Sequence, residues 1–139
     1  MTAVARWRSG LTHDVEVRGH TIVSDEPGSV GGDDVGPTPQ ELIAGALAAC
    51  TAITLRMYGG RKGWDLDGLE VVAESGPGER GACGPFVVTL RLPNGLSEEQ
   101  VRRLRVIAGK CPVHRTLASP GACVIEDRVE LVGLSADAR

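Results

Sequence analysis

Hydrophobic and polar residues are unevenly distributed along the chain, and one long uncharged run holds the 14 residues that follow Glu41. Thr38 and Pro39 are typical of a helix N-cap and first helical residue, and Glu41 completes a capping box with Thr38. The run therefore predicts a helix that begins after Thr38 and ends near the Gly59-Gly60 pair. Because this helix is apolar all round and rich in small residues, we expect it to be buried at the centre of the fold, with room for a second copy beside it.

Upstream of this helix, short stretches of alternating apolar and polar residues predict three strands. They cover residues 3–8, 13–18 and 21–23, and Gly19 supplies the unusual backbone angle of the turn between the second and the third. Together they form a small antiparallel meander. Residues 24–38 follow as a loop, because their prolines, glycines and acidic residues exclude regular structure.

Downstream, a hairpin, two helices and a closing strand are predicted. Residues 69–74 and 86–92 form the hairpin around a glycine-rich connection, a second helix starts at Ser97, and a short third helix opens at Cys111. Residues 123–131 predict the closing strand. Hairpins and helices in this order indicate an α+β fold rather than a parallel, doubly wound sheet.

The composition fits a single domain that spans residues 1–139. Apolar residues make up 42% of the chain but aromatic residues only 3%, so aliphatic side chains must form the core, and a shared dimer core would supplement it. The net charge is −3 and basic residues are not interleaved with aromatics, which argues against a nucleic-acid partner. The N-terminus does not resemble a secretory signal and the uncharged run is shorter than the roughly 20 residues of a membrane span, so we expect a cytoplasmic protein without a membrane partner.

Four cysteines carry the candidate chemistry, and in the cytoplasm they indicate thiols, metal ligands or redox groups before structural disulfides. Cys50 lies in the middle of the apolar helix. It can pack there as a small hydrophobic residue or act as a reactive thiol, and periodicity alone favours the packing role. Its apolar setting is expected to raise its pKa unless a cation lies nearby.

Cys111 has different surroundings, because it occupies an N-cap position. A thiolate there would meet free backbone N–H groups and the positive end of the helix dipole, and His114 and Arg115 could add positive charge. Cys111 is therefore the better candidate for a lowered pKa. A simple capping role is the alternative.

A zinc site and a hydrolase are weaker alternatives. Cys111 and His114 have a permissible ligand spacing, and Cys83 and Cys123 could complete a set of four. The sequence has no paired Cys-x-x-Cys motif, however, and zinc leaves Cys50 unexplained, so we predict no metal and regard Cys83 and Cys123 as incidental. A Cys–His hydrolase with His114 as base is disfavoured, because a nucleophile and its base usually come from distant segments.

Residues 36–58, GPTPQELIAGALAACTAITLRMY, are followed by RKGW and later by KCPVHRTL, and these motifs resemble the OsmC/Ohr family. The family pattern has a Pro-x-Glu-Leu helix start, a small-residue helix ending in Ala-Cys, and a second cysteine at Cys-Pro. The upstream segment GHTIVSDEPGSVGGDDVGPTP is similar to the OsmC-like branch. The resemblance implies an intertwined α+β homodimer, in which antiparallel sheets wrap around the long central helices of two subunits.

The resemblance also implies an activity, the thiol-dependent reduction of hydroperoxides, often organic ones, in defence against oxidative stress. Cys50 would be the peroxidatic thiol and Cys111 the resolving thiol, and an external thiol would reduce the Cys50–Cys111 disulfide without any metal or other cofactor. The implied partners are a hydroperoxide, a thiol reductant and a second copy of the chain. The alternative is a non-catalytic protein of the same fold that binds a small ligand and whose cysteines are structural.

The sequence departs from the family pattern in one place. The best-known members carry a glutamate ten residues before the peroxidatic cysteine, where this chain has Gln40. Glu41 lies half a turn away from Cys50 around the helix, so we expect it to act as the capping acid. For the activating cation, Arg18 in the hairpin turn could reach the site from either subunit or remain a solvated turn residue, and Arg115 is another candidate.

Overall fold

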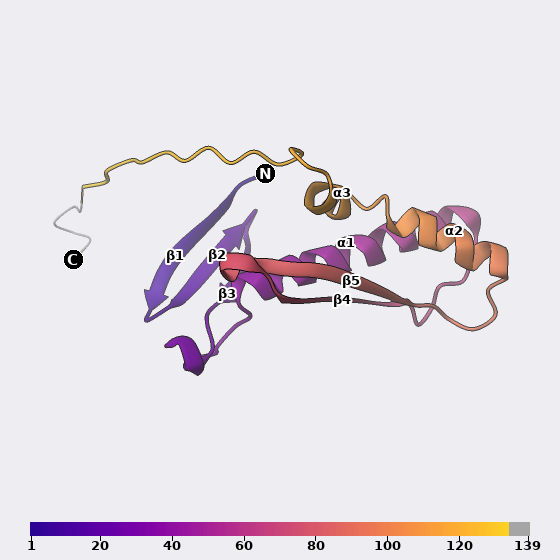
Figure 1. The fold of residues 1–139 in the computed structure, drawn as a ribbon, viewed down its shortest axis with the longest axis horizontal. Helices are drawn as coiled ribbons and strands as arrows, with labels where there is room; N and C mark the ends of the chain where they lie inside the picture. Colours follow the sequence, from indigo (N-terminus) through magenta and orange to yellow (C-terminus); the bar gives the residue numbers. More distant parts are fainter. Residues whose placement is uncertain (134–139) are drawn as a thin grey trace.

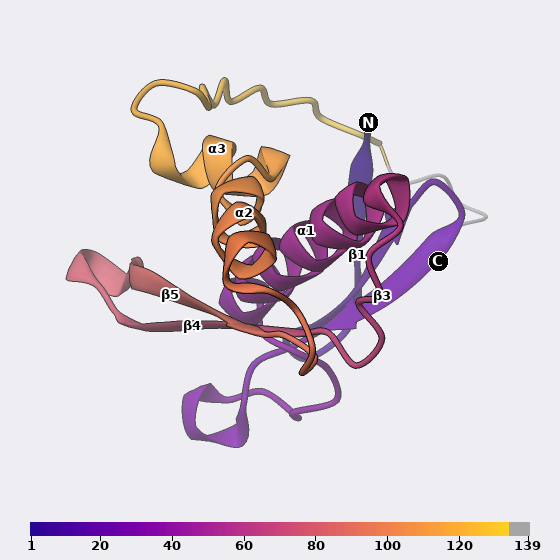
Figure 2. The ribbon, with the colours of Figure 1, turned by 90° about the vertical axis from the view of Figure 1, so that its right-hand side faces the viewer.

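The computed structural model describes residues 1–133, which form an elongated α+β fold around one long helix (Figure 1). Its elements are β1 Ala3–Ser9, β2 Thr12–Val17, β3 His20–Ser24, η1 Gly28–Val30, α1 Pro39–Lys62, β4 Glu70–Pro77, η2 Glu79–Gly81, β5 Cys83–Arg91, α2 Glu98–Ala108 and α3 Pro112–Ala118. The antiparallel sheet β1-β2-β3 lies at the N-terminal end of α1, and the β4–β5 hairpin runs alongside the helix. Helices α2 and α3 also pack on α1 (Figure 2).

The predicted N-terminal meander is confirmed, and β2 is its central strand. Val15 on β2 lies opposite Ala5 on β1 and Ile22 on β3. The β2–β3 turn places both of its central residues in the left-handed region, Arg18 at φ 51° and Gly19 at φ 81°. Two positive φ angles are typical of tight hairpin turns, because they follow the right-handed twist of the strands. Arg18 therefore shares the unusual backbone angle that the sequence assigns to Gly19 alone, and it lies at the exposed tip of the hairpin.

The loop before α1, predicted to lack regular structure, contains the short η1 turn and is ordered around Asp25, which is 2% exposed. The Asp25 carboxylate accepts hydrogen bonds from the Thr12 hydroxyl at 3.0 Å and from the N–H groups of Glu26 at 2.8 Å, Asp33 at 3.2 Å and Val35 at 3.4 Å. Burial raises the pKa of Asp25, but these donors outweigh burial and hold it below its ordinary value. The carboxylate therefore stabilises the fold above the pKa of an unfolded Asp, and this stabilisation is lost as the pH falls through the folded pKa.

Helix α1 begins where the sequence predicts. Thr38 is the N-cap, Pro39 is the first helical residue, and the Glu41 N–H donates to the Thr38 hydroxyl at 3.1 Å. Only this half of the predicted capping box is formed, because the hydrogen bonds of residues 1–133 include none from the Thr38 N–H to the Glu41 carboxylate. The cap still fixes the direction in which the chain enters the helix.

The predicted end of α1 is wrong. The helix continues through Gly59 and Gly60 to Lys62 and stops at Gly63, whose φ is 69°. Gly59 is buried against the Leu66 side chain. Close packing at Gly59 compensates for the low helix propensity of glycine, whereas only Gly63 adopts the left-handed conformation of a helix C-cap.

The core lies between α1, the β4–β5 hairpin and α2, and aliphatic side chains form its centre as predicted. The buried cluster consists of Leu55, Leu66, Leu104 and Ile107. Two of the four aromatic residues, Tyr58 and Trp64, lie at its edge with their rings in an edge-to-face contact at 5.6 Å between centroids. The core therefore covers one face of α1, the face that carries Leu55.

The expectation that α1 is buried all round is not met by one chain. Only Leu47, Thr51, Leu55 and Gly59 are buried within the helix. A stripe of exposed apolar residues, which we call the α1 stripe, runs along another face and consists of Ile43, Ala46, Ile53 and Met57. The length and composition of α1 also meet the criteria for a membrane-spanning helix. The core helices of globular proteins meet the same criteria.

The predicted closing strand at residues 123–131 is not formed. Residues 123–133 are unpaired and leave the body of the molecule as an outstretched segment (Figure 1). Their apolar side chains are exposed, for example Val124 at 87% and Leu131 at 96%. A strand needs a neighbour whose backbone groups pair with its own, and none of the strands in residues 1–133 pairs with this segment.

Gly59→Ala and Gly60→Ala form a matched pair that tests how tightly α1 is held on the core. A Cβ at Gly59 would lie 2.4 Å from Cδ1 of Leu66, whereas nothing lies within 4 Å of a Cβ at Gly60. We expect Gly59→Ala to lower the free energy of unfolding by about 1–3 kcal/mol through overpacking. We expect Gly60→Ala to raise it by up to about 1 kcal/mol, because alanine is the better helix former. Chemical denaturation measures both, and equal stabilities would show that the Leu66 contact does not restrain the helix.

Candidate active site

Cys50 and Cys111, far apart in the sequence, meet where α3 packs on α1. Their side chains are hydrogen-bonding partners, and neither forms a disulfide. Cys50 is half-buried, at the border between the covered side of α1 and the α1 stripe, whereas Cys111 is 0% exposed. Cys83, at the start of β5, and the exposed Cys123 take no part in this contact.

The start of α3 holds Cys111 in place. Cys111 is the N-cap of α3, and its Sγ accepts a hydrogen bond from the His114 N–H at 3.4 Å, as a serine or threonine oxygen would at this position. Pro112 follows as the first helical residue, which presets the backbone for the turn. The Val113 N–H also faces the Cys111 sulfur, and so does the Thr51 hydroxyl, whose proton is donated to the Leu47 carbonyl at 2.8 Å. The sulfur is thus surrounded by groups that favour its thiolate.

Cys50 has fewer stabilising neighbours. Besides Cys111, its sulfur faces the Val113 N–H and the Thr54 hydroxyl. The Thr54 hydroxyl donates to the Cys50 carbonyl at 2.7 Å, so its proton is already engaged with the backbone. The Cys50 thiolate is therefore less well supported than that of Cys111.

The pKa values of the two thiols shift in opposite directions. Burial is the largest effect on Cys50 and raises its pKa, and the hydrogen bond with Cys111 raises it further, against weaker donors that lower it. Burial also raises the pKa of Cys111, but hydrogen bonds from Cys50, the His114 N–H and other nearby donors outweigh it, so its pKa is lowered. Cys111 is therefore the first to lose its proton, in the direction that its N-cap position predicts, while Cys50 keeps the S–H that donates to it.

Among the residues that the structure describes, the other predicted site residues do not contact the thiols through their side chains. His114 bonds to Cys111 through its backbone N–H, and Arg115 follows it on α3 with an exposed side chain. Arg18 lies at the tip of the β2–β3 hairpin, where it has no hydrogen bond to either cysteine. No arginine of residues 1–133 is among the main causes of the pKa shift of either thiol.

Gln40 and Glu41 act at the start of α1 rather than at the thiols. The Gln40 side-chain amide donates to the Gly81 carbonyl, which ties the start of α1 to the β4–β5 hairpin. A glutamate could not make this contact, because an ionised carboxylate only accepts hydrogen bonds. Glu41 is exposed, and only its backbone N–H takes part in the cap, by donating to the Thr38 hydroxyl. Gln40, which replaces the glutamate of the family pattern, therefore makes a contact with the β4–β5 hairpin that a glutamate would not make.

Sequence reasoning did not single out the threonines and the backbone groups around the thiols. Thr51 and Thr54 follow Cys50 at spacings of one and four residues, which places both on the same side of it around the helix, at about 100° and 40°. The only signal in the sequence is that both are hydroxyl residues inside an otherwise apolar helix. The Val113 N–H becomes a thiol neighbour only through tertiary packing.

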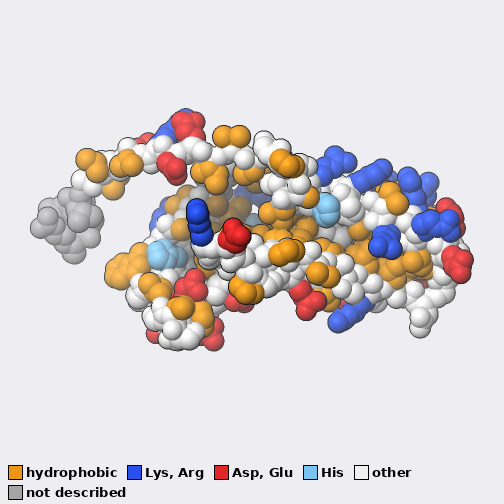
Figure 3. Space-filling model, in the orientation of Figure 1, with side chains coloured by type: hydrophobic (Ala, Val, Ile, Leu, Met, Phe, Trp, Pro, Cys, Tyr) orange, Lys and Arg blue, Asp and Glu red, His pale blue; other side chains and the backbone are white. Residues whose placement is uncertain are grey.

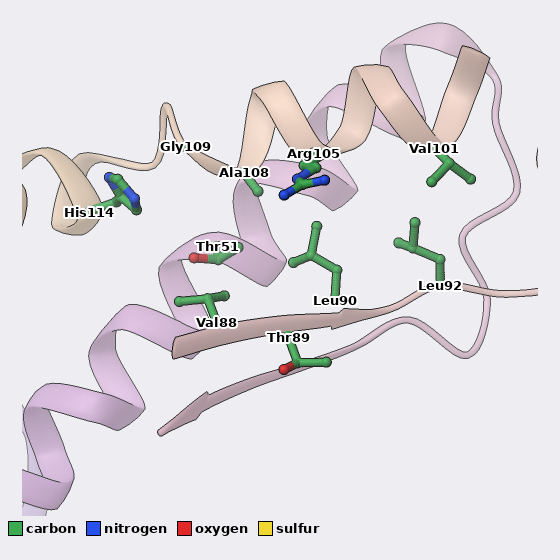
Figure 4. Close-up of a pocket in the computed structure, with 10 residues that line it drawn as sticks. All are labelled: Thr51, Val88, Thr89, Leu90, Leu92, Val101, Arg105, Ala108, Gly109 and His114. Carbon is green, nitrogen blue, oxygen red and sulfur yellow. The ribbon is translucent and has the colours of Figure 1, made fainter. Parts of the chain in front are cut away.

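A cavity of about 470 Å³ lies on the other side of Thr51, between β5, α2 and α3. Arg105 extends from α2 toward β5, and His114 lies at the α3 end of the cavity (Figure 4). Sequence reasoning did not identify Arg105 either, because it lies in an ordinary run of charged residues on α2. Thr51 connects the two places, since it lines the cavity and faces the Cys111 sulfur.

The ligand set of the zinc alternative is not gathered at one place. It would combine Cys83, Cys111, His114 and Cys123. Within residues 1–133, no three His, Cys, Asp or Glu side chains are grouped so that they could hold a metal ion. The polar groups around the thiols are hydroxyls and backbone N–H groups.

Comparisons with known proteins identify the family and similar folds. A family model described as OsmC-like protein matches residues 31–126. The crystal structure of an OsmC-like protein from Mycoplasma pneumoniae is similar with a TM-score of 0.70 and 19% identity over 95% of each chain. An organic hydroperoxide resistance protein OsmC from Legionella pneumophila is similar with a TM-score of 0.59 and 21% identity, over 86% of this chain and 90% of that chain. An organic hydroperoxide resistance protein from Elizabethkingia anophelis is similar with a TM-score of 0.64 and 23% identity, over 86% of this chain and 90% of that chain. A search of curated proteins found no match.

The titration of the thiol pair tests its hydrogen bond. In a background with Cys83→Ser and Cys123→Ser, ultraviolet thiolate absorbance reports only Cys50 and Cys111. We expect Cys50→Ala to raise the pKa of Cys111, because the S–H donor is lost, and Cys50→Ser to raise it less, because a hydroxyl still donates. Cys111→Ala should in turn lower the pKa of Cys50. An unchanged Cys111 titration in Cys50→Ala would mean that the N-cap donors alone set its pKa.

Proposed function

This chain belongs to the OsmC-like protein family, and from that premise we propose that it is a thiol-dependent peroxidase that reduces organic hydroperoxides in defence against oxidative stress. The observation that carries the proposal is the contact between the Cys50 and Cys111 side chains. Two neighbouring thiols can form a disulfide after one of them is oxidised. Similar structures from two other bacteria are named organic hydroperoxide resistance proteins, which supports the choice of substrate class.

Exposure and acidity assign different roles to the two thiols. Cys50 is the one that a hydroperoxide can reach, because Cys111 is 0% exposed. The reactive form of Cys50 is its thiolate. The neighbouring Cys111 thiolate can take the Cys50 proton through the hydrogen bond that joins them. Cys111 thus acts first as the base that activates Cys50.

The first chemical step oxidises Cys50. Its thiolate attacks the distal oxygen of the hydroperoxide, an S–O bond forms, and the O–O bond breaks. The products are the Cys50 sulfenic acid and an alkoxide, which takes the proton from Cys111 and leaves as an alcohol. Cys111 is then a thiolate again, with its sulfur beside the sulfenic acid.

The second step forms the disulfide. The Cys111 thiolate attacks the Cys50 sulfur, the S–S bond forms, and hydroxide leaves and becomes water by taking a proton from solvent. An external thiol then returns both cysteines to the reduced state by two thiol–disulfide exchanges. This chemistry requires no metal or organic cofactor, and we place it in the cytoplasm, whose thiol pool can supply the reductant.

A homodimer is part of the proposal. The α1 stripe offers an apolar surface that a second copy would bury, and Cys50 lies at its border. Residues 123–133 carry exposed apolar side chains and unpaired backbone groups, which would pair with a strand of the second copy. Arg18, at the tip of a hairpin away from its own thiols, would be free to approach those of the second copy as the activating cation.

The alternative is a non-catalytic ligand-binding protein whose cysteines are structural. The thiol contact disfavours it, because packing alone does not require that two cysteines share a hydrogen bond and shift each other's pKa. The cavity near Thr51 leaves ligand binding possible in addition to catalysis rather than in place of it.

Substoichiometric tert-butyl hydroperoxide tests the catalytic roles. We expect a Cys50–Cys111 disulfide in peptide mass spectra of the non-reduced protein, and peroxide consumption at the uncatalysed rate for Cys50→Ser. Cys111→Ser should stop at a Cys50 sulfenic acid that a sulfenate-specific reagent labels, and Cys83→Ser, the matched control, should turn over normally. The proposal is wrong if Cys50→Ser consumes peroxide as fast as the unaltered protein.

Ile53→Glu tests the dimer. Ile53 is 59% exposed in the α1 stripe, and a carboxylate there would have to be desolvated in an apolar interface, so we expect a monomer by sedimentation analysis. Val106→Glu is the control, because Val106 is 48% exposed on α2, outside the stripe. A monomeric unaltered protein, or a dimeric Ile53→Glu variant, would remove the stripe as the interface.

A further inference from the structure

Two cavities adjoin along one face of β5, and we call them together the β5 groove. The first has a volume of about 470 Å³ and lies between β5, α1, α2 and α3. The second, of about 380 Å³, continues beneath α3 toward the start of β5. Val88 and His114 line both, so the two are parts of one groove. Each volume falls within the range of small-molecule sites, roughly 300–1,000 Å³.

The walls of the groove are mainly apolar. Val88 and Leu90 of β5 line the first cavity together with Leu92, just after the strand, and Val101 of α2. The second cavity is lined by Leu47, Phe86 and Leu117, among others. Hydrophobic side chains occupy the larger part of the molecular surface seen between α2 and β5 (Figure 3). Such a surface is suited to an alkyl chain rather than to a fully polar ligand.

Arg105 is the one Lys or Arg side chain among the residues that line the groove. Arg105 extends from α2 toward β5, and His114 lies at the junction of the two cavities (Figure 4). No Asp or Glu lines either cavity. Among residues 1–133, Arg105 has no ion-pair partner, whereas its neighbour Arg102 pairs with Glu99 at 3.3 Å. An unpaired guanidinium over an apolar wall is complementary to an anion that carries an alkyl chain.

We propose that the β5 groove binds an amphipathic monocarboxylate, whose carboxylate pairs with the Arg105 guanidinium and whose alkyl chain follows β5 toward Phe86. A guanidinium donates two parallel hydrogen bonds to a carboxylate, which a neutral hydroxyl cannot match. The site lies on a different side of α1 from the α1 stripe, because Thr51 belongs to the buried face of the helix. The proposal goes beyond peroxide reduction and holds whether or not the thiols are catalytic.

The groove is separated from the Cys111 sulfur by two residues that touch both. Thr51 and His114 line the groove, and each also faces the sulfur, through the Thr51 hydroxyl and the His114 N–H. A carboxylate bound in the groove would place a negative charge near the Cys111 thiolate. Like charges disfavour each other's ionised forms, so occupancy of the groove would make this thiolate form at a higher pH. The ligand would therefore act as an effector of the thiol pair.

Calorimetric titration with sodium octanoate and 1-octanol tests the site on the full chain. We expect octanoate to bind the unaltered protein at least about tenfold more tightly than octanol, because only the acid forms charge-assisted hydrogen bonds. Arg105→Gln should remove this difference, and Arg105→Lys should keep part of it. Arg102→Gln, the matched control on the same helix, should leave it unchanged. Absence of octanoate binding, equal binding of acid and alcohol, or an unaffected Arg105→Gln variant would overturn the proposal.

Two further measurements keep the test decisive. If Arg105→Gln does not fold, the comparison of octanoate with octanol on the unaltered protein still tests whether the site prefers a carboxylate. Raised salt should then weaken only the binding of the acid. Thiolate absorbance in the background with Cys83→Ser and Cys123→Ser provides the second readout. Saturating octanoate should move the first titration of the thiol pair to higher pH, and octanol should not. A titration that octanoate leaves unchanged would overturn the link between the groove and Cys111.

Discussion

A helix that is apolar on every side has to be covered on every side, and a single chain covers α1 on one side only. The β4–β5 hairpin, α2 and α3 all pack against the face that carries Leu47, Thr51 and Leu55. The opposite face exposes Ile53 and Met57, although exposed apolar surface of this extent is costly in water. The positions of the remaining elements follow from this constraint. Cys50 lies at the border between the two faces, where it is near solvent and near the buried Cys111 at the same time.

The thiol pair separates two properties that a single cysteine combines with difficulty. A nucleophile has to be reached by its substrate, and a stable thiolate has to be surrounded by donors that occupy the space around it. Cys111 has the donors, from the N-cap position of α3, and is inaccessible. Cys50 is accessible and has few donors, and its hydrogen bond to Cys111 gives it a route for its proton. The two residues together have what neither has alone.

Local signals in the sequence predicted the features that depend on a few neighbouring residues. The start of α1 at Thr38 and the N-cap role of Cys111 are of this kind, because capping chemistry is decided within one turn. The glycine pair at residues 59 and 60 does not end α1, because Gly59 packs against Leu66, a tertiary contact that helix propensity does not contain. The pairing of residues 123–131 depends on a neighbouring strand, which no local pattern can supply.

The candidate site shows the same division. Periodicity placed Cys50 on an apolar helix and favoured a packing role, and only the family resemblance joined it to Cys111. The structure adds the contact between the two and the hydroxyl groups of Thr51 and Thr54, which have no distinctive sequence context. Arg105 could not be distinguished from its charged neighbours on α2, because its position over the β5 groove is a property of tertiary packing.

The buried carboxylate of Asp25 has a consequence for how the molecule meets a partner. It joins Thr12 on β2 to the loop that leads into α1, and the Ser24 hydroxyl adds a bond to the Pro37 carbonyl at 2.9 Å. The three-stranded sheet protrudes from the body, and on a flexible tether it would swing through many orientations (Figure 1). These bonds lock it to the start of α1, so that the entropy of orienting it is lost when the chain folds rather than when two chains associate. In the proposed dimer the sheet would approach the second copy as a preorganised arm with Arg18 at its end.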